Sequence, residues 1–488
     1  MAAARSCARP ARGLRERSLS RASAQRPGAS ARRVSRAQPG AARAPPRADP
    51  RRAALGPGPA GALARSRPRA PHLLPARAAR SAGRDADRPA RARRARRARG
   101  RAVRIALTHP HASDVGGVER QAHSVAQALL DAGHEVHFFC QRADTSIDQR
   151  IAVHRISNPL RPVRSFKVWW FDSACERAVA AAGPFDLVHG FGKTSRQDVY
   201  FDGSGCLADF QSWSIDGAIA SPWRRRLRRA SPHQRVVARI ERARYASGNY
   251  RRVLAISELV RQQILDRYGL PPHDVERLYP GVDLDRFAPD PAARQRTRRA
   301  LGLGDEVPLL AFLGSDYRRK GIDTLFAALA KLPGAHAFVI GGERAARRAR
   351  YEADARAAGI AGRVHWLGVQ TDPQRWLAAA DLMLFPTRFD AFGSAVLEAL
   401  ACGVPALASR RAGAAELLAE GKTGSVLDAL DDGEAWAAAA RPFLHPARRA
   451  ELRALARESA ERHPWSHHTQ RVLEVYRELV SDRPPRGR

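Results

Sequence analysis

Several kinds of sequence pattern are missing from this chain of 488 residues. Its five cysteines stand far apart without a Cys-x-x-Cys pair, which argues against a zinc knuckle and favours a reduced, intracellular protein. No apolar run reaches the roughly 18 residues that a membrane span needs. Residues 1–30 also lack the apolar stretch of a secretory signal. The sequence contains neither of two phosphate-binding motifs, the Gly-x-Gly-x-x-Gly fingerprint and the Walker A loop.

Acidic residues are scarce at the N-terminal end. Residues 1–100 hold 27 arginines, no lysine and four acids, and so carry most of the formal net charge of +36. The Ala, Arg, Pro, Gly and Ser of this segment bury too little apolar surface to offset the entropy of ordering, so we expect residues 1–101 to be disordered. Three interpretations stay open: a basic nucleic-acid arm, an Arg-rich organellar presequence, or upstream sequence that is not normally translated. Under the last interpretation, GC-rich DNA translated as protein would give this composition, and the protein would start near Val103.

From residue 103 onward the sequence alternates between strand and helix patterns. Residues 103–108 are typical of a buried strand, apolar residues recur at helical spacing over 118–129, and 135–140 are typical of a second strand. A strand–helix–strand unit with short connections is right-handed and implies a parallel sheet. Further strands of this sheet are expected at 186–189 and 253–256.

The same alternation begins again near residue 307, after the Pro-Gly break of Tyr279–Asp283. A helix is expected over 324–332, and strands at 308–314, 337–340, 364–367, 382–385 and 404–407. We therefore predict an α/β protein with two Rossmann-like domains facing a cleft, where ligands bind beyond the carboxyl ends of the strands. The predicted divisions are a disordered basic segment 1–101, an N-terminal domain 102–281, a C-terminal domain 282–456, and a C-terminal helix 457–488 that crosses back to the N-terminal domain.

The most informative stretch runs from Phe385 to Pro405. A strand ends at Phe385, a loop presents Asp390, and a helix begins near Gly393 with Glu398 one turn inside it. Backbone N–H groups at a helix start bind hydroxyl or phosphate oxygens, and two acids there suit the paired hydroxyls of sugars. The alternative is that Asp390 is an N-terminal helix charge and Glu398 a solvated helix residue.

Other candidate ligand contacts follow strands. Arg319 and Lys320 stand between a strand and a helix, where two cations suit a diphosphate; the alternative is an ordinary basic loop. In the first domain, Gly116 and Gly117 would let the backbone approach a phosphate or sugar closely, although a pair of glycines is more often only a turn.

Together these motifs resemble the retaining glycosyltransferases of family 4, which have the two-domain fold called GT-B. The resemblance spans about 103–480, and the Asp390/Glu398 block resembles the family's Glu-x7-Glu signature, with Asp390 where the family usually has Glu. Within the family, the chain is similar to enzymes that add glucose to the lipopolysaccharide core. The stretches that carry this similarity are Gly116–Gln121, Gly190–Lys193 leading to Asp198–Phe201, and Leu313–Asp323.

The resemblance implies roles in binding a nucleotide-sugar donor. Arg319, Lys320 and Asp390 would be catalytic, the two cations on the diphosphate and the carboxylate on the sugar, while Glu398 would hold the ribose hydroxyls. The nucleobase would lie between the segment after Gly341-Gly342 and the loop Gly368–Thr371. The residues implied to contact the donor are Gly116, Gly117, His189, Val369, Ala391, Phe392, Gly393 and Glu398. His189 could equally be a packed histidine at a strand end.

The resemblance also implies retention of the anomeric configuration, with the departing phosphate taking the acceptor's proton on the same face. That chemistry needs no enzymic nucleophile, metal or other cofactor, and no Asp-x-Asp sequence occurs next to Asp390 or Glu398. His463, His467 and His468 have metal-like spacing but no His-Glu-x-x-His helix, so we interpret them as helix-turn histidines.

A basic stretch in the first domain contains tryptophan. Nine arginines and one acid fall between residues 222 and 244. Basic residues flanked by Trp suit an anionic membrane surface, where each charge adds about 1 kcal/mol; a solvated basic helix is the alternative. The resemblance implies contact here with the membrane and a phosphorylated lipid acceptor. The candidate residues are Lys193, Asp198, Trp223, Arg224, Arg225, Arg226 and Arg228.

The sequence thus predicts a glycosyltransferase that moves a hexose, glucose by resemblance, from a nucleotide diphosphate sugar to a lipopolysaccharide core or similar glycolipid. Its expected partners are the donor, a lipid-linked glycan and an anionic membrane, but no nucleic acid. Its expected location is cytoplasmic, on the inner face of the cytoplasmic membrane. Two other classes stay open: a basic nucleic-acid-binding protein, which no recognised motif supports, and a GT-B-shaped sugar-binding protein without turnover.

Overall fold

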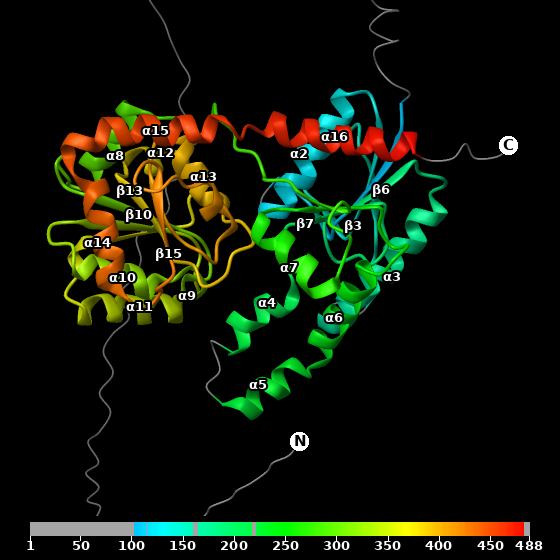
Figure 1. Ribbon diagram of the computed structural model, residues 1–488, viewed down its shortest axis with the longest axis horizontal. Coiled ribbons are helices and arrows are strands. Elements are labelled where there is room, and N and C mark those ends of the chain that lie inside the picture. Colours follow the sequence, from blue (N-terminus) through cyan, green and yellow to red (C-terminus); the bar gives the residue numbers. More distant parts are fainter. Residues whose placement is uncertain (1–101, 115, 160–163, 217–220, 483–488) are drawn as a thin grey trace, which may run out of the picture. The chain divides into compact units, whose positions relative to one another are not determined.

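The computed structural model describes residues 102–114, 116–159, 164–216 and 221–482, which lie in one compact unit, Ser81–Arg488. Two parallel sheets with helices packed around them make up this part of the chain (Figure 1). The predicted fold of two α/β domains is therefore confirmed. The predictions for segment 1–101 fall outside the described residues.

The first sheet contains seven strands among the described residues, all parallel to their neighbours. In spatial order they are β5 (Ala152–Arg155), β3 (Glu135–Cys140), β1 (Arg104–Thr108), β6 (Leu187–Gly190), β7 (Val199–Asp202), β8 (Arg252–Ala255) and β9 (Val275–Arg277). The sequence predicted β1, β3, β6 and β8. It missed β5 because this edge strand is largely exposed and has no apolar pattern. The short strands β2 (His111–Ala112) and β4 (Arg142–Ala143) pair beside this sheet.

Helices connect these strands, and capping residues fix both ends of the last of these helices. Ser257 precedes one helix and accepts a hydrogen bond from the Val260 N–H, and Gly269, with a φ of +63°, ends it. The helical segments are α2 (Gly117–Asp131), α3 (Arg164–Ala181), α4 (Leu207–Gln211), the π-helical turn η1 (Ser212–Asp216), α5 (Pro222–Arg229), α6 (Pro232–Arg244) and α7 (Glu258–Tyr268).

The second sheet, over residues 309–427, which are all described, has six parallel strands. Their spatial order is β12 (Val364–Gly368), β11 (His336–Ile340), β10 (Leu309–Leu313), β13 (Leu382–Phe385), β14 (Ala406–Ser409) and β15 (Gly424–Leu427). All but β15 were predicted, because β10, β11, β13 and β14 are nearly or fully buried and read as continuous apolar runs.

The helices of this second half pack on both faces of the sheet (Figure 1). They are α8 (Pro291–Ala300), α9 (Tyr317–Lys320), α10 (Ile322–Ala330), α11 (Ala345–Ala357), η2 (Ala361–Arg363), α12 (Pro373–Ala379), α13 (Ser394–Ala401), η3 (Gly413–Leu417), α14 (Gly433–Leu444), η4 (Pro446–Arg448) and α15 (Arg449–Glu461). No helix in the described ranges combines the length and apolarity that crossing a bilayer requires.

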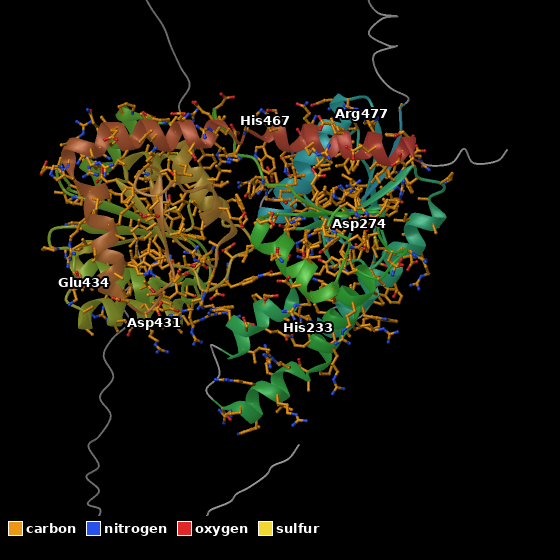
Figure 2. The ribbon with its side chains drawn as sticks, in the orientation of Figure 1. His233, Asp274, Asp431, Glu434, His467 and Arg477 are labelled. Carbon is orange, nitrogen blue, oxygen red and sulfur yellow. The ribbon has the colours of Figure 1, made fainter. Side chains whose placement is uncertain are left out.

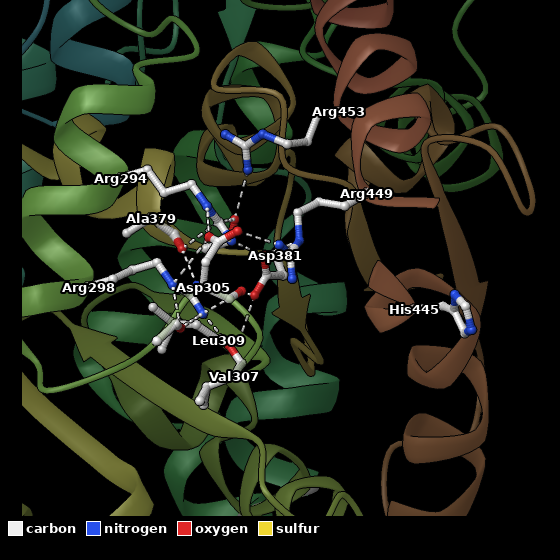
Figure 3. A network of polar contacts seen from close by, with 12 residues as sticks. Arg294, Arg298, Asp305, Val307, Leu309, Ala379, Asp381, His445, Arg449 and Arg453 are labelled. Atoms are coloured by element: carbon white, nitrogen blue, oxygen red, sulfur yellow. Dashed lines mark hydrogen bonds and ion pairs between the residues drawn. The ribbon is translucent and has the colours of Figure 1, made fainter. Parts of the chain in front are cut away.

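A buried carboxylate ties together the amino ends of the second sheet. Asp381 accepts hydrogen bonds from Arg294 at 2.8 Å, from Arg298 at 3.2 Å and from the Leu309 N–H at 2.9 Å (Figure 3). Its side chain is only 3% exposed. This network lies at the edge opposite the carboxyl ends of the strands, so we assign it to stability rather than to ligand binding.

The last helix, α16 (Trp465–Ser481), packs against α2 of the first half of the chain. The connection before α16 runs beside the linker between the two sheets, where Val282 N–H donates to the His463 carbonyl at 2.9 Å. A Cβ on Gly281 would lie 2.3 Å from the Trp465 Cα, so only glycine fits there. On α16, Arg471 forms an ion pair with Glu276 at 2.6 Å, which fixes the helix to β9.

Candidate active site

The loop between β13 and α13 carries Asp390 and is held from both sides. Gly393 precedes α13 with a φ of +95°, and a Cβ there would lie 2.6 Å from the Phe385 ring. Only glycine therefore lets the chain turn into the helix at this point. From the first domain, the Ser257 hydroxyl donates to the Ala391 carbonyl at 2.7 Å. The loop thus has one defined path next to the first domain.

Arg319 and Lys320 end helix α9 and converge on this loop. Arg319 Nη1 donates to Asp390 Oδ2 at 2.8 Å and to the Phe389 carbonyl at 2.9 Å. The Lys320 ammonium contacts the same Oδ2 oxygen and lies 4.3 Å from the centre of the Phe385 ring. The two cations share this carboxylate, and a second one, Asp316, lies 3.8 Å from Arg319 Nε.

Burial and charge act in opposite directions on these groups. Burial lowers the pKa of Lys320, and the neighbouring Asp390 offsets only part of this. Burial alone would raise the pKa of Asp390, but Lys320 and Arg319 outweigh it, and the pKa lies below its usual value. Asp390 is therefore a carboxylate at neutral pH.

Glu398 lies in α13, eight residues after Asp390, and pairs with a different partner. Its Oε1 oxygen accepts a hydrogen bond from Arg120 Nη1 at 3.0 Å, and its side chain is 15% exposed. Burial raises the pKa of Glu398, although Arg120 opposes the rise. The alternative of a solvated helix residue does not hold for Glu398, because this side chain is mostly buried and paired.

Two cavities bring these groups together with the first domain. The larger one, of about 860 Å³, is lined by Arg319, Asp390 and Ala391 on one side and by first-domain side chains on the other, among them Lys193, Arg228 and His233 at the start of α6 (Figure 2). The smaller one, of about 460 Å³, is lined by Gly116, Gly117, Arg120, Arg286 and Glu398 among others. Arg319 and Asp390 therefore line the larger cavity and Glu398 the smaller one, while the buried Lys320 lines neither.

The two segments predicted to hold a nucleobase lie side by side. The Gly341 N–H donates to the Gly368 carbonyl at 2.8 Å, and Gly342 lies against Val369, whose side chain is 75% exposed. Arg286 Nη2 donates to the Thr371 carbonyl at 3.0 Å and so anchors the end of the second segment. An exposed apolar side chain beside glycine backbone offers a flat ring a surface to stack on.

His189 and Asp198 are not where a ligand-contact role requires them. His189 is fully buried; its Nδ1 lies 2.5 Å from the hydroxyl of Tyr476 on α16, and its ring stacks on Phe191. Asp198 accepts a hydrogen bond from the Val188 N–H at 2.9 Å and so binds the backbone of β6. Neither residue lines either cavity. The buried and stacked ring of His189 fits the packed-histidine alternative, and Asp198 holds the backbone of β6.

The other predicted residues of the first domain are accessible. Lys193 has a φ of +65°, unusual for a residue other than glycine, and lines the larger cavity. On α5, Trp223 and Leu227 are 64% and 65% exposed. Arg224, Arg226 and Arg228 are also exposed, whereas Arg225 is half-buried. The basic stretch thus presents a helix with two exposed apolar side chains among arginines.

The histidines with metal-like spacing do not converge. His468 is buried and pairs with the Tyr279 carbonyl at 2.8 Å, while His467 lies 3.2 Å from the Arg462 carbonyl. An Asp-x-Asp sequence does come near Glu398, at Asp283 and Asp285 in the linker, but Asp283 accepts from the N–H groups of its own turn. The described residues hold no group of three or more potential metal ligands. Independence from metal stays a prediction.

Two family profiles match the chain. Glycosyltransferase Family 4 matches residues 115–196 and 212–286, and Glycosyl transferases group 1 matches residues 293–463. The chain therefore contains a Glycosyltransferase Family 4 domain followed by a Glycosyl transferases group 1 domain. The two profiles correspond to the two halves of the chain, and the second contains Arg319, Asp390 and Glu398.

Individual relatives agree with this assignment. Lipopolysaccharide glucosyltransferase WaaG of Escherichia coli is 27% identical over 328 residues, 64% of this chain and 82% of WaaG. D-inositol 3-phosphate glycosyltransferase of Mycolicibacterium smegmatis is 32% identical over 239 residues, 47% of this chain and 54% of the relative, so this match spans about half of that enzyme.

Solved structures share the fold. The crystal structure of WaaG superposes with a TM-score of 0.66 at 24% identity, covering 76% of this chain and 99% of WaaG. Anabaena HepE in complex with UDP-glucose gives a TM-score of 0.60 at 18% identity, with 77% and 100% of the two chains covered. At these identities the likeness shows the GT-B fold.

Three contacts of the site carry no signal in the sequence. Arg120 lies in the Gly116–Gln121 motif, but the spacing of residues in the sequence does not identify Glu398 as its partner. Ser257 caps its own helix and also holds the Ala391 carbonyl of the other domain. Glu416 of η3 accepts hydrogen bonds from two N–H groups at the start of α7, at 2.8 and 2.7 Å. All three join residues more than 130 positions apart.

Proposed function

We propose that this glycosyltransferase transfers glucose from UDP-glucose, with retention of configuration, to a sugar of the lipopolysaccharide core or of a similar glycolipid. The observation that carries the proposal is that Arg319 and Asp390 line a large cavity and that the buried Lys320 contacts the same Asp390 oxygen from behind this wall. A pair of fixed cations suits a diphosphate leaving group, and a carboxylate beside it suits sugar hydroxyls.

In the proposed reaction the bond between the anomeric carbon and the diphosphate oxygen breaks, and its electron pair stays on the phosphate. Arg319 and Lys320 stabilise this growing negative charge more than they stabilise the intact donor, which is what accelerates a reaction. The acceptor hydroxyl oxygen bonds to the anomeric carbon on the face that the phosphate leaves, and its proton passes to the departing phosphate oxygen. No metal, cofactor or enzymic nucleophile takes part in this scheme.

The identity of the donor rests on the relatives. WaaG is named a lipopolysaccharide glucosyltransferase, and HepE has been solved with UDP-glucose. Glu398, with one oxygen held by Arg120 and its side chain at the wall of the smaller cavity, is suited to paired ribose hydroxyls. We assign the nucleobase to the surface between Gly342 and Val369.

The acceptor side is assigned to the larger cavity and to α5. Lys167, Lys193 and Arg228 line the cavity wall opposite Asp390 and would attract an anionic glycan. Trp223 and Leu227 project from α5 among arginines, which suits a helix that rests on an anionic bilayer. We therefore place the enzyme on the inner face of the cytoplasmic membrane, with a lipid-linked acceptor and no role in nucleic-acid binding.

The test is a donor screen with a product identified by mass. The purified chain is incubated with UDP-, GDP- or ADP-glucose and either a lipopolysaccharide core acceptor or inositol 3-phosphate, since D-inositol 3-phosphate glycosyltransferases are also relatives. The proposal expects transfer from UDP-glucose to the core acceptor, with an α-configured product by proton NMR. Binding of donor without transfer or hydrolysis would favour the sugar-binding alternative, and a β-configured product would contradict retention.

A further inference from the structure

Arg120 connects the two domains at the site of Glu398. It lies in the first turn of α2, three residues after Gly117, and its guanidinium reaches Glu398 of α13 at 3.0 Å. Only the Oε1 oxygen of Glu398 takes this hydrogen bond, and both residues line the smaller cavity. An arginine at this place restricts the orientation of the carboxylate.

We propose that Arg120 is a positioning residue for donor binding, which fixes Glu398 so that its second oxygen is presented to the ribose hydroxyls. The inference rests on the proposed function, because Glu398 is taken to bind the ribose. The inference goes beyond the proposed function because it gives the first domain a part in binding the nucleotide. Arg120 itself touches no donor atom in this scheme.

The charges around Glu398 support a special part for Arg120. Its cationic neighbours are Arg120 from α2, Arg286 from the linker and Lys320 from α9; the Cys402 thiol lies on its own helix. Lys320 is paired with Asp390, and Arg286 donates to the Thr371 carbonyl. Burial raises the pKa of Glu398, and Arg120 makes the largest contribution against that rise. Without Arg120, the carboxylate loses both its fixed orientation and its main counter-charge.

The first experiment compares two ligands in isothermal titration calorimetry. UDP contains a ribose, whereas inorganic pyrophosphate carries the charge without it. Arg120→Ala is expected to weaken UDP binding at least tenfold and to change pyrophosphate binding less than twofold, with Arg120→Lys between Arg120→Ala and wild type. Arg410→Ala is the matched control, because it removes an Arg–Asp pair of 2.8 Å that is exposed and lines neither cavity.

Two further arms separate positioning from a loss of folding or of charge. Replacement of UDP by 2′-deoxy-UDP should cost wild type several-fold in affinity and cost Arg120→Ala nothing further. Glu398→Gln, which keeps the shape of the side chain, should weaken UDP binding and make the Arg120→Ala change silent. The acidic limb of the pH dependence of UDP affinity should move to higher pH in Arg120→Ala, because the pKa of Glu398 rises.

UDP binding by Arg120→Ala that equals or exceeds that of wild type would overturn the inference, and so would equal weakening of UDP and pyrophosphate. Failure of the wild-type chain to bind UDP, ADP or GDP would instead overturn the proposed function together with the inference. The two failures are therefore distinguishable in the same set of titrations.

Discussion

The Oδ2 oxygen of Asp390 accepts a hydrogen bond from Arg319 Nη1 at 2.8 Å, and the Lys320 ammonium contacts the same oxygen. In the absence of a donor, one carboxylate therefore neutralises part of the charge that we assign to diphosphate binding. A diphosphate that enters the site competes with Asp390 for both cations, and Asp390 is then free to accept hydrogen bonds from the sugar.

Asp390→Asn separates these two roles. The neutral amide removes the carboxylate that Arg319 and Lys320 share, so pyrophosphate should bind at least threefold more tightly, while the rate of sugar transfer should fall at least tenfold. Calorimetry and an initial-rate assay on the same preparation measure both. Weaker pyrophosphate binding would show that Asp390 does not compete with the ligand for these cations, and Asp390→Glu, the family's usual residue, serves as the conservative control.

Asp381→Asn should lower the free energy of unfolding by about 3–5 kcal/mol, because it removes the buried carboxylate that Arg294 and Arg298 share and leaves them only the exposed Asp305. The control is Asp428→Asn, which breaks the exposed pair with Arg410 and should change stability by less than about 1 kcal/mol. Urea unfolding at pH 7 measures both. An equal effect of the two changes would contradict a stabilising role for the network in Figure 3.

Stability should fall as the pH drops below about 6.5. Burial lowers the pKa of His189 to about 3 and that of His468 to about 4, so the unfolded chain binds protons that the folded chain does not. Each histidine then lowers the free energy of unfolding by about 1.4 kcal/mol for every pH unit between its unfolded and folded pKa values. Its full stabilising contribution is present above the pKa of the unfolded chain.

Urea unfolding of wild type and of His189→Gln at pH 7.5, 6 and 5 measures this slope. Glutamine has no group that titrates here, so the variant should lose less stability on acidification than wild type. Parallel curves for the two proteins would mean that His189 takes up a proton without unfolding.

Binding to anionic vesicles should depend on α5. Sedimentation with vesicles of phosphatidylglycerol and phosphatidylcholine should decrease when Arg224, Arg226 and Arg228 are changed to Glu, and should weaken as salt rises from 50 to about 300 mM, since salt screens surface charges. Trp223→Ala should reduce binding without changing its salt dependence, because it removes apolar contact only. Unchanged binding by the triple Arg→Glu variant would favour a solvated basic helix.

Much of the fold was predictable because buried parallel strands are continuous apolar runs. Leu309–Leu313 and Leu382–Phe385 have no polar residue, so their strands and their position in a sheet followed directly from the sequence. Val199–Asp202 is buried too, but it is only four residues long and ends in a polar residue, and exposed strands such as Ala152–Arg155 lack any pattern.

The site was predictable where its residues are close in sequence. Asp390, Gly393 and Glu398 lie on one loop and one helix, so their spacing placed them together. His189 was ambiguous because a histidine at a strand end faces either the ligand or a covering helix, and its contact with Tyr476 of α16 could not be predicted from the sequence. The pair of Arg120 with Glu398 depends on how two domains dock, which no local pattern encodes.

The most direct test of the account is the initial rate of glucose transfer or UDP-glucose hydrolysis by Lys320→Ala and Glu398→Ala, with Arg410→Ala as control. Lys320→Ala removes a cation from the leaving phosphate and Glu398→Ala removes the ribose contact, so each should lower turnover at least tenfold at limiting donor. The control should keep the wild-type rate. Wild-type rates in both Lys320→Ala and Glu398→Ala would contradict the assignment of the active site.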